Sequence, residues 1–112
     1  MLPKLHCLTG QENFKKVATG GRSFFLKELG LKWRENNLTN SRFAFVVSTQ
    51  IDKRSTVRNK IKRRLRDIVY QRLEKIKPGF DLMFLTRPAI KNLEYADLAK
   101  LAEQLLIKAG LI

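Results

Sequence analysis

A long amphipathic segment from Thr56 to Ile76 constrains the fold of this chain more than any other feature. Its apolar residues recur at spacings of three to five, mostly three or four, which predicts a helix with one apolar stripe. Pro78-Gly79 marks the end of that helix. Such a stripe must be buried against another element of the same domain. Its members are Val57, Ile61, Leu65, Ile68, Val69, Leu73 and Ile76.

Two apolar stretches on either side of this helix can provide the packing surface. Residues 42–48 are rich in aromatic and β-branched residues, and residues 80–86 are nearly all apolar, as in a strand covered on both faces. A strand, a helix and a second strand in this order favour parallel pairing of the two strands. Residues 29–34 alternate between apolar and polar side chains and predict a further, half-buried strand. The pattern leaves open whether residues 23–27 form a separate strand.

Two shorter helices are expected near the ends of the chain. Thr9 can cap a helix over about residues 10–19, which Gly20-Gly21 would stop, and Asn92 can cap one that ends near Ala109. The 112 residues, 44% apolar and 29% charged, suit one globular domain. The predicted class is therefore α+β, with residues 1–112 forming a single domain.

The charge indicates a polyanionic partner. The chain has 23 Lys and Arg against 10 Asp and Glu, for a formal net charge of +13. A merely solvated helix would mix acids with bases, but eight of the fourteen residues from Lys53 to Arg66 are basic and none is acidic. A membrane-surface helix would carry Trp or Phe on its apolar face, and this one does not. We therefore expect a domain that binds a polyanion, with nucleic acid and an acidic protein as candidates, and no membrane partner; Asn59 among the cations suits phosphate and sugar groups.

Residues that could support catalysis are scarce. The single His and single Cys are neighbours, His6 and Cys7, and cannot supply the four ligands of a structural zinc site. We expect no catalytic residue and no protein-bound metal or cofactor. A lone cysteine also fits a reducing, cytoplasmic location. Asp67 is predicted to pair with Arg63 or Arg64 on its own helix.

The phenylalanines admit two interpretations. Aromatic rings beside cations can stack on unpaired bases, but a Phe in a strand usually belongs to the core. Phe14, followed by Lys15 and Lys16 on an amphipathic helix, fits either role equally well. For the four strand residues we predict the core: Phe24, Phe25, Phe43 and Phe45.

The stretch Arg58-Asn59-Lys60-Ile61-Lys62-Arg63-Arg64-Leu65-Arg66 resembles the Arg-Asn-Arg signature helix of the bacterial ribonuclease P protein subunit. The resemblance covers nearly the whole chain. Shorter matches are Met1-Leu2-Pro3-Lys4, Glu12-Asn13-Phe14-Lys15-Lys16-Val17, Gly21-Arg22-Ser23-Phe24, Phe45-Val46-Val47-Ser48 and Arg87-Pro88-Ala89.

This resemblance implies a fold and a function. The fold would be a two-layer α-β-β-β-α-β-α sandwich, similar to a ribosomal-protein domain, with a left-handed crossover through the signature helix. The protein would join a catalytic RNA in a ribonucleoprotein endonuclease that removes the 5′ leader from precursor tRNA. Mg²⁺ would be held by RNA and substrate, and the protein would be a monomer within the complex. The alternative is a general RNA-binding or ribosomal-type protein without a role in cleavage.

The resemblance also implies two sets of site residues. The signature surface would comprise Arg58, Asn59, Lys60, Lys62, Arg63 and Arg66, and a leader-binding cleft would comprise Phe14, Lys15, Arg22, Lys53 and Arg54. Three positions depart from the family pattern. Lys60 stands where Arg is usual, Ala18 where a second cleft aromatic is common, and Thr49-Gln50 where a basic pair is usual.

Overall fold

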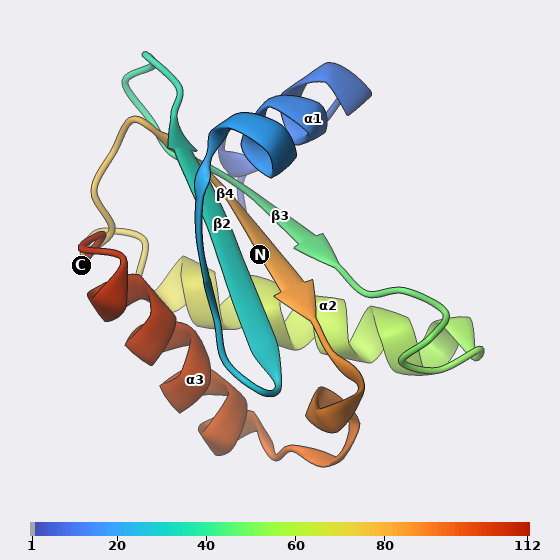
Figure 1. The fold of residues 1–112 in the computed structure, drawn as a ribbon. Helices are drawn as coiled ribbons and strands as arrows, with labels where there is room; N and C mark the ends of the chain where they lie inside the picture. Colours follow the sequence, from blue (N-terminus) through green and yellow to red (C-terminus); the bar gives the residue numbers. More distant parts are fainter. Residues whose placement is uncertain (1) are drawn as a thin grey trace.

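The computed structural model describes residues 2–112, so Met1 of the matched N-terminal stretch lies outside the described residues (Figure 1). Two short 3-10 helices, η1 and η2, accompany three α-helices and four strands. This order confirms the predicted α+β class and the α-β-β-β-α-β-α arrangement. Along the chain the elements are η1 (Lys4–His6), α1 (Gln11–Gly20), β1 (Arg22–Phe25), β2 (Leu29–Glu35), β3 (Arg42–Val46), α2 (Ser55–Gln71), β4 (Phe80–Thr86), η2 (Pro88–Asn92) and α3 (Tyr95–Lys108).

The four strands form one mixed sheet in the order β1-β2-β4-β3. β1 pairs antiparallel with β2, which answers the open question about residues 23–27 in favour of a separate strand. β2 pairs antiparallel with β4, and β3 pairs parallel with β4, with Phe43 opposite Leu82 and Phe45 opposite Phe84. The predicted parallel pairing around the basic helix is thus confirmed, and it leaves β3 at one edge of the sheet.

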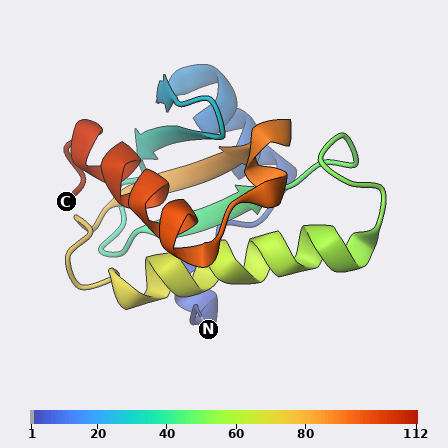
Figure 2. The ribbon, with the colours of Figure 1, turned by 90° about the horizontal axis from the view of Figure 1, so that it is seen from below.

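The crossover from β3 through α2 to β4 is left-handed. In Figure 1, β3 and β4 both point to the lower right, β4 lies to the left of β3, and α2 passes behind the sheet. Figure 2 shows α1 and α2 on opposite sides of the sheet. Crossovers between parallel strands are right-handed in nearly all proteins, so this connection is unusual. It places one flank of α2 beside the free edge of β3.

Side-chain alternation along the strands gives the sheet two buried faces of unequal size. The main core joins one face to α2 and α3, with Leu31, Leu82 and Phe84 of the sheet packed with residues such as Leu65 and Leu105. A smaller core on the other face holds Leu8, Val17, Ala44 and Met83. The predicted two-layer sandwich therefore describes the sheet with α2 and α3, and α1 adds a partial cover on the second face.

The ends of the helices differ from the prediction. α2 ends at Gln71 rather than near Ile76, because the chain continues in tighter turns in which the Arg72 and Leu73 N–H groups donate to the Val69 and Tyr70 carbonyls, three residues back. Ile76 is still buried, so the apolar stripe outlasts the helix. An apolar stripe indicates which side of a segment is buried. It does not indicate at which residue the helix ends.

Both predicted N-caps are wrong. Gly10, with φ of +91°, occupies the cap of α1, and Thr9 instead accepts a hydrogen bond at its carbonyl from the Asn13 side chain. α3 begins at Tyr95 with Glu94 as its N-cap, because Asn92 is already the last residue of η2.

Strand phenylalanines follow the alternation of their strands. Phe43 is buried and Phe24 and Phe45 are packed against the main core, as predicted. Phe25 is 41% exposed, so its assignment to the core is wrong. It follows Phe24 in an edge strand and therefore points to the opposite face, where the Arg87 guanidinium carbon lies 5.1 Å from its ring centroid.

Two acidic side chains hold elements together. Asp81 on β4 accepts bonds of 2.8 Å and 2.7 Å from Nε and Nη2 of Arg42 on β3, and the hydrogen bond to Asp81 raises the pKa of Arg42. Asp67 on α2 accepts hydrogen bonds from the Tyr95 hydroxyl and from the Gln71 side chain. The hydrogen bond between Tyr95 and Asp67 raises the pKa of Tyr95. The predicted ion pair of Asp67 with Arg63 or Arg64 is therefore wrong, because α3 supplies a closer partner.

We expect Gly21→Ala to destabilise the protein more than Gly30→Ala. A Cβ atom at position 21 would lie 2.6 Å from the Trp33 carbonyl oxygen and 2.7 Å from that of Val17, and backbone cannot easily move away. At position 30 the obstacle is the ring of Phe25, an exposed side chain that can turn aside. The expected loss for Gly21→Ala is about 1–3 kcal/mol in the free energy of unfolding. Urea unfolding of both variants checks this, and equal losses would contradict it.

Candidate nucleic-acid interface

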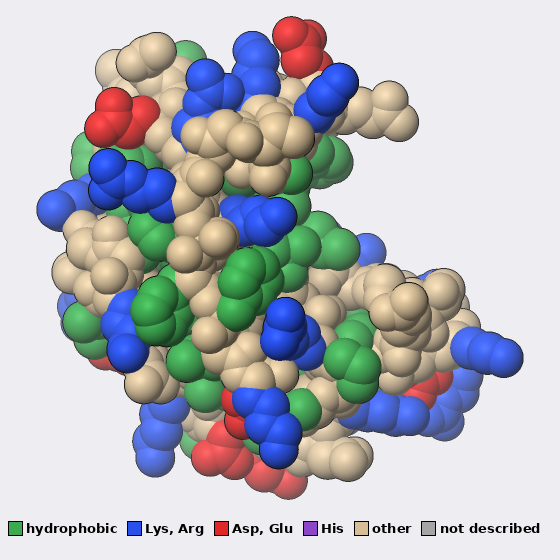
Figure 3. Space-filling model, in the orientation of Figure 1, with side chains coloured by type: hydrophobic (Ala, Val, Ile, Leu, Met, Phe, Trp, Pro, Cys, Tyr) green, Lys and Arg blue, Asp and Glu red, His purple; other side chains and the backbone are tan. Residues whose placement is uncertain are grey.

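A groove of about 550 Å³ lies between α1, the edge strand β3 and α2. In Figure 3 the surface is hollowed on the right, below α1 and above the start of α2, and hydrophobic side chains are visible there. Phe14 reaches the groove from α1, and Lys62 and Arg66 reach it from α2. The remaining lining residues come from β3, the residue after it and the segment before α1: Leu2, Cys7, Leu8, Thr9, Phe43, Ala44, Phe45, Val46 and Val47.

The free edge of β3 borders this groove. The Leu8 N–H donates to the Phe43 carbonyl at 2.8 Å, so the segment before α1 covers the start of that edge. Peptide groups of alternate residues point the same way, so those of Phe45 also face the edge. Within residues 2–112 no partner occupies the Phe45 peptide groups on that side. An edge of this kind offers hydrogen-bond donors and acceptors to a ligand.

Aromatic and cationic side chains lie on opposite sides of the groove. Phe14 is 36% exposed although it sits on the face of α1 that also carries the buried Val17. Phe45 is stacked on Phe84 with 5.8 Å between ring centroids, which fixes the groove floor. Lys62 and Arg66 are four residues apart and hence adjacent on one flank of α2. The structure therefore places Phe14 at the groove rather than in the core.

The basic residues of α2 divide between two flanks. Arg58, Lys62 and Arg66 succeed one another at steps of four and form a row on the groove flank. Asn59 and Arg63 are exposed beside that row. Lys60 is exposed on the other flank with Arg64, whose guanidinium donates to the Leu93 carbonyl at 3.4 Å in the approach to α3. The signature residues thus face two directions.

The residues predicted for the leader cleft do not all gather there. Lys15 is exposed on α1 next to Phe14 and is not among the lining residues. Arg22 is on β1, at the opposite edge of the sheet from the groove. Lys53 and Arg54 are in the segment that leads into α2. Of the five residues predicted for the cleft, only Phe14 lines the groove. Lys62 and Arg66, which are predicted for the signature surface, also line it.

A buried carboxylate holds the segment before α2 in place. The Asp52 side chain is 6% exposed and accepts 2.8 Å bonds from the Arg54 backbone N–H and the Lys91 ammonium. Its Oδ2 also lies 3.0 Å from Nη2 of Arg54. The hydrogen bonds from Arg54 and then Lys91 hold the pKa of Asp52 far below its usual range. This cluster ties the start of α2 to η2, and it partly neutralises Arg54.

We expect Asp52→Asn to lower stability at neutral pH and to lose this effect in acid. The folded state depresses the pKa of Asp52, so its contribution is present above the pKa of the unfolded chain, about 4, and fades as the pH falls below that value. Thermal unfolding from acid to neutral pH would measure the gap between variant and parent. Glu74→Gln, at an exposed acid, is the matched control and should show a smaller gap. A gap that stays constant with pH would contradict the assignment.

Across residues 2–112, no three His, Cys, Asp or Glu side chains lie close enough together to hold a metal ion. None of the helices described has the length and apolarity needed to cross a membrane.

Comparison with known proteins gives consistent matches over almost the full chain. A sequence model of the family described as Ribonuclease P matches residues 2–110. The ribonuclease P protein component of a Synechocystis species is 31% identical over 116 residues, which covers 99% of this chain and 90% of the relative. That of Synechococcus elongatus is 29% identical over 116 residues, covering 99% and 95%.

Solved structures agree on the fold. A mutant RNase P protein from Staphylococcus aureus superposes with a TM-score of 0.91 at 21% identity, over 97% of this chain and 92% of that chain. The RNase P protein from Thermotoga maritima gives a TM-score of 0.80 at 24% identity, over 88% and 94%. The left-handed crossover and the groove beside it therefore occur in a fold that these proteins share.

Proposed function

This chain belongs to the family of ribonuclease P protein components, and on that premise we propose that it binds the catalytic RNA through α2 and the 5′ leader of precursor tRNA in the groove. The observation that carries the proposal is the groove itself, in which Phe14 and the free edge of β3 face Lys62 and Arg66. An aromatic ring, unpaired backbone groups and two cations are the groups that hold a single strand of RNA.

Each wall of the groove has its own role in the proposal. Bases of the leader stack on Phe14 or hydrogen-bond to the β3 edge, and their phosphates are neutralised by Lys62 and Arg66. Stacking on Phe14 and hydrogen bonding to the β3 edge both require bases that are not paired with a second strand, so recognition there depends on the leader being single-stranded. A mature tRNA lacks the leader and loses these contacts.

The outward residues of α2 would contact the catalytic RNA. Arg58, Asn59 and Arg63 extend the groove flank onto the outer surface, where they can reach phosphates and sugar hydroxyls. Lys60 faces the α3 flank and would make a separate contact. The start of α2, held by Asp52, fixes the direction in which this surface points.

The chemistry of cleavage would reside in the RNA. We place Mg²⁺ on RNA and substrate, and we assign no catalytic residue to the protein, whose contribution is binding and orientation. One protein monomer would serve each complex, in the cytoplasm where precursor tRNA is made.

Reconstitution tests the proposal. The protein is combined with a closely matched bacterial ribonuclease P RNA, and cleavage of precursor tRNA is followed at a Mg²⁺ concentration at which the RNA alone is inactive. Rescue of cleavage supports the proposal. Binding to the RNA without rescue would favour the alternative, a general RNA-binding protein.

We expect Arg58→Ala and Arg63→Ala each to weaken assembly with the catalytic RNA by about tenfold, because each removes a charge-assisted bond to phosphate. The dissociation constant of the RNA complex measures this. Lys100→Ala removes an exposed cation from α3 and should have little effect. If all three variants bind equally well, α2 is not the RNA-binding surface.

A further inference from the structure

A second cavity, of about 480 Å³, lies on the main-core side of the sheet, toward the edge away from the groove. Its floor is formed by Trp33, Glu35 and Phe80, which share one sheet face because Glu35 pairs with Phe80 across β2 and β4. Arg22 is directly opposite Trp33 in the β1–β2 pair and so points to that same face. Residues 109–111, which follow α3, and Lys77 close the other side.

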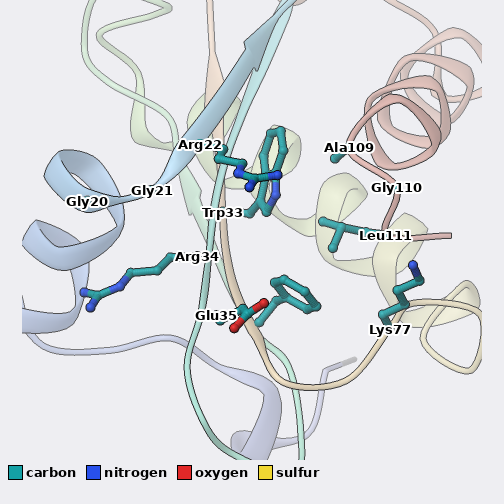
Figure 4. Close-up of a pocket in the computed structure, with 11 residues that line it drawn as sticks. Gly20, Gly21, Arg22, Trp33, Arg34, Glu35, Lys77, Ala109, Gly110 and Leu111 are labelled. Atoms are coloured by element: carbon teal, nitrogen blue, oxygen red, sulfur yellow. The ribbon is translucent and has the colours of Figure 1, made fainter.

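Figure 4 shows four chemically different side chains around this space. Arg22 and Trp33 lie together on the sheet, Glu35 lies further along β2, and Lys77 stands across the cavity near Leu111. Arg34 belongs to the lining but turns away toward α1. The main chain around the cavity is held in place, because the Lys77 N–H donates to the Leu111 carbonyl at 2.9 Å and Gly21 packs directly on the Trp33 backbone.

The charged side chains that face the cavity, those of Arg22, Glu35 and Lys77, form no ion pairs within the part of the chain that the structure describes. Two cations beside an aromatic ring suit a phosphate and a flat base. A simple anion site would not include Glu35, whereas a carboxylate can accept a hydrogen bond from an N–H on a base edge.

We propose that this cavity binds a nucleotide, with its base on Trp33, its phosphate between Arg22 and Lys77, and a base N–H donated to Glu35. The volume falls within the range of small-ligand sites, about 300–1,000 Å³. The nucleotide can be an unpaired residue of RNA or a free mononucleotide, since both present the same groups. As an RNA site, the inference rests on the proposed function and gives the protein a second RNA contact across the sheet from the groove.

Trp33 is the only tryptophan of the chain, so the tryptophan fluorescence of the protein comes from the floor of this cavity. We expect adenosine 5′-monophosphate to quench the emission in a saturable manner. Adenosine, which lacks the phosphate, should bind at least about tenfold more weakly, and inorganic phosphate should not quench. The absence of saturable quenching by both the mononucleotide and single-stranded RNA would overturn the proposal.

Variants locate the binding. Arg22→Ala and Lys77→Ala should each weaken quenching by adenosine 5′-monophosphate about tenfold, since each removes a charged phosphate partner. Lys75→Ala, at an exposed cation outside the lining, is the matched control and should bind as the parent does. Thermal unfolding establishes that all three are folded. Quenching that is unchanged in both Arg22→Ala and Lys77→Ala would refute the site.

Two further measurements identify the source of the nucleotide and distinguish this cavity from the groove of the proposed function. Quenching by a single-stranded oligonucleotide at much lower concentration than by the mononucleotide would identify RNA as the source, and equal potency would identify a free nucleotide. Phe14→Ala should leave this quenching unchanged while it weakens leader binding in the groove. Loss of quenching in Phe14→Ala would show that Trp33 responds to RNA in the groove, and would overturn the second site without affecting the first.

Discussion

Replacing Phe14 by Ala is expected to weaken binding of precursor tRNA by about 5- to 150-fold and to leave mature tRNA unaffected, because stacking on an aromatic side chain contributes about 1–3 kcal/mol per base. Phe14 is the exposed aromatic ring of α1 at the groove, and Ala18, one turn further along the helix, has no ring that could replace it. Equilibrium binding of the reconstituted complex to both tRNA forms measures the two affinities.

Phe25→Ala provides a matched control. Phe25 is 41% exposed, close to the 36% of Phe14, but it belongs to β1 at the opposite edge of the sheet. Its removal should change neither affinity. Equal weakening of precursor and mature tRNA by Phe14→Ala would mean that the ring only stabilises α1, and unfolding measurements on both variants would reveal such a loss.

The parts of the fold that could be predicted are those that depend on periodicity. The stripe on α2 and the apolar stretch that became β4 together imply a parallel β-α-β unit, and the structure contains it. The exact ends of the helices could not be predicted, because Ile76 is buried in a turn as effectively as it would be in a helix. The cap of a helix also depends on the neighbouring element. Asn92 is the last residue of η2, so Glu94 becomes the N-cap of α3.

The groove could be anticipated only in part. Phe14 and the basic helix are evident in the sequence. The position of Lys62 and Arg66 across the groove from Phe14 depends on the left-handed crossover, which no local pattern encodes. The resemblance implies that Arg22 belongs to the leader-binding cleft. The sheet order instead carries it to the far edge, beside Trp33, a contact made by the β1–β2 register.

Binding of the catalytic RNA should fall by about 10³–10⁵ between 50 and 200 mM salt if six to ten phosphates are neutralised, since each neutralised phosphate releases condensed counterions. Within residues 2–112, the α2 cations assigned to the catalytic RNA, Arg58, Lys60 and Arg63, take part in no ion pair with acidic side chains and are free to act in this way. The slope of log affinity against log salt concentration measures the number of contacts. A flat response would contradict the assignment of α2 to RNA binding.

Single substitutions should then identify which cations are in contact. Arg58→Ala and Arg63→Ala should each lower the magnitude of that slope by about 1. Arg54 lies four positions before the signature begins at Arg58, but Asp52 already partners its guanidinium at 3.0 Å. Arg54→Ala should therefore change the slope less than either variant. If Arg54→Ala changes it as much, RNA breaks the Asp52 pair on binding, and the segment before α2 becomes part of the interface.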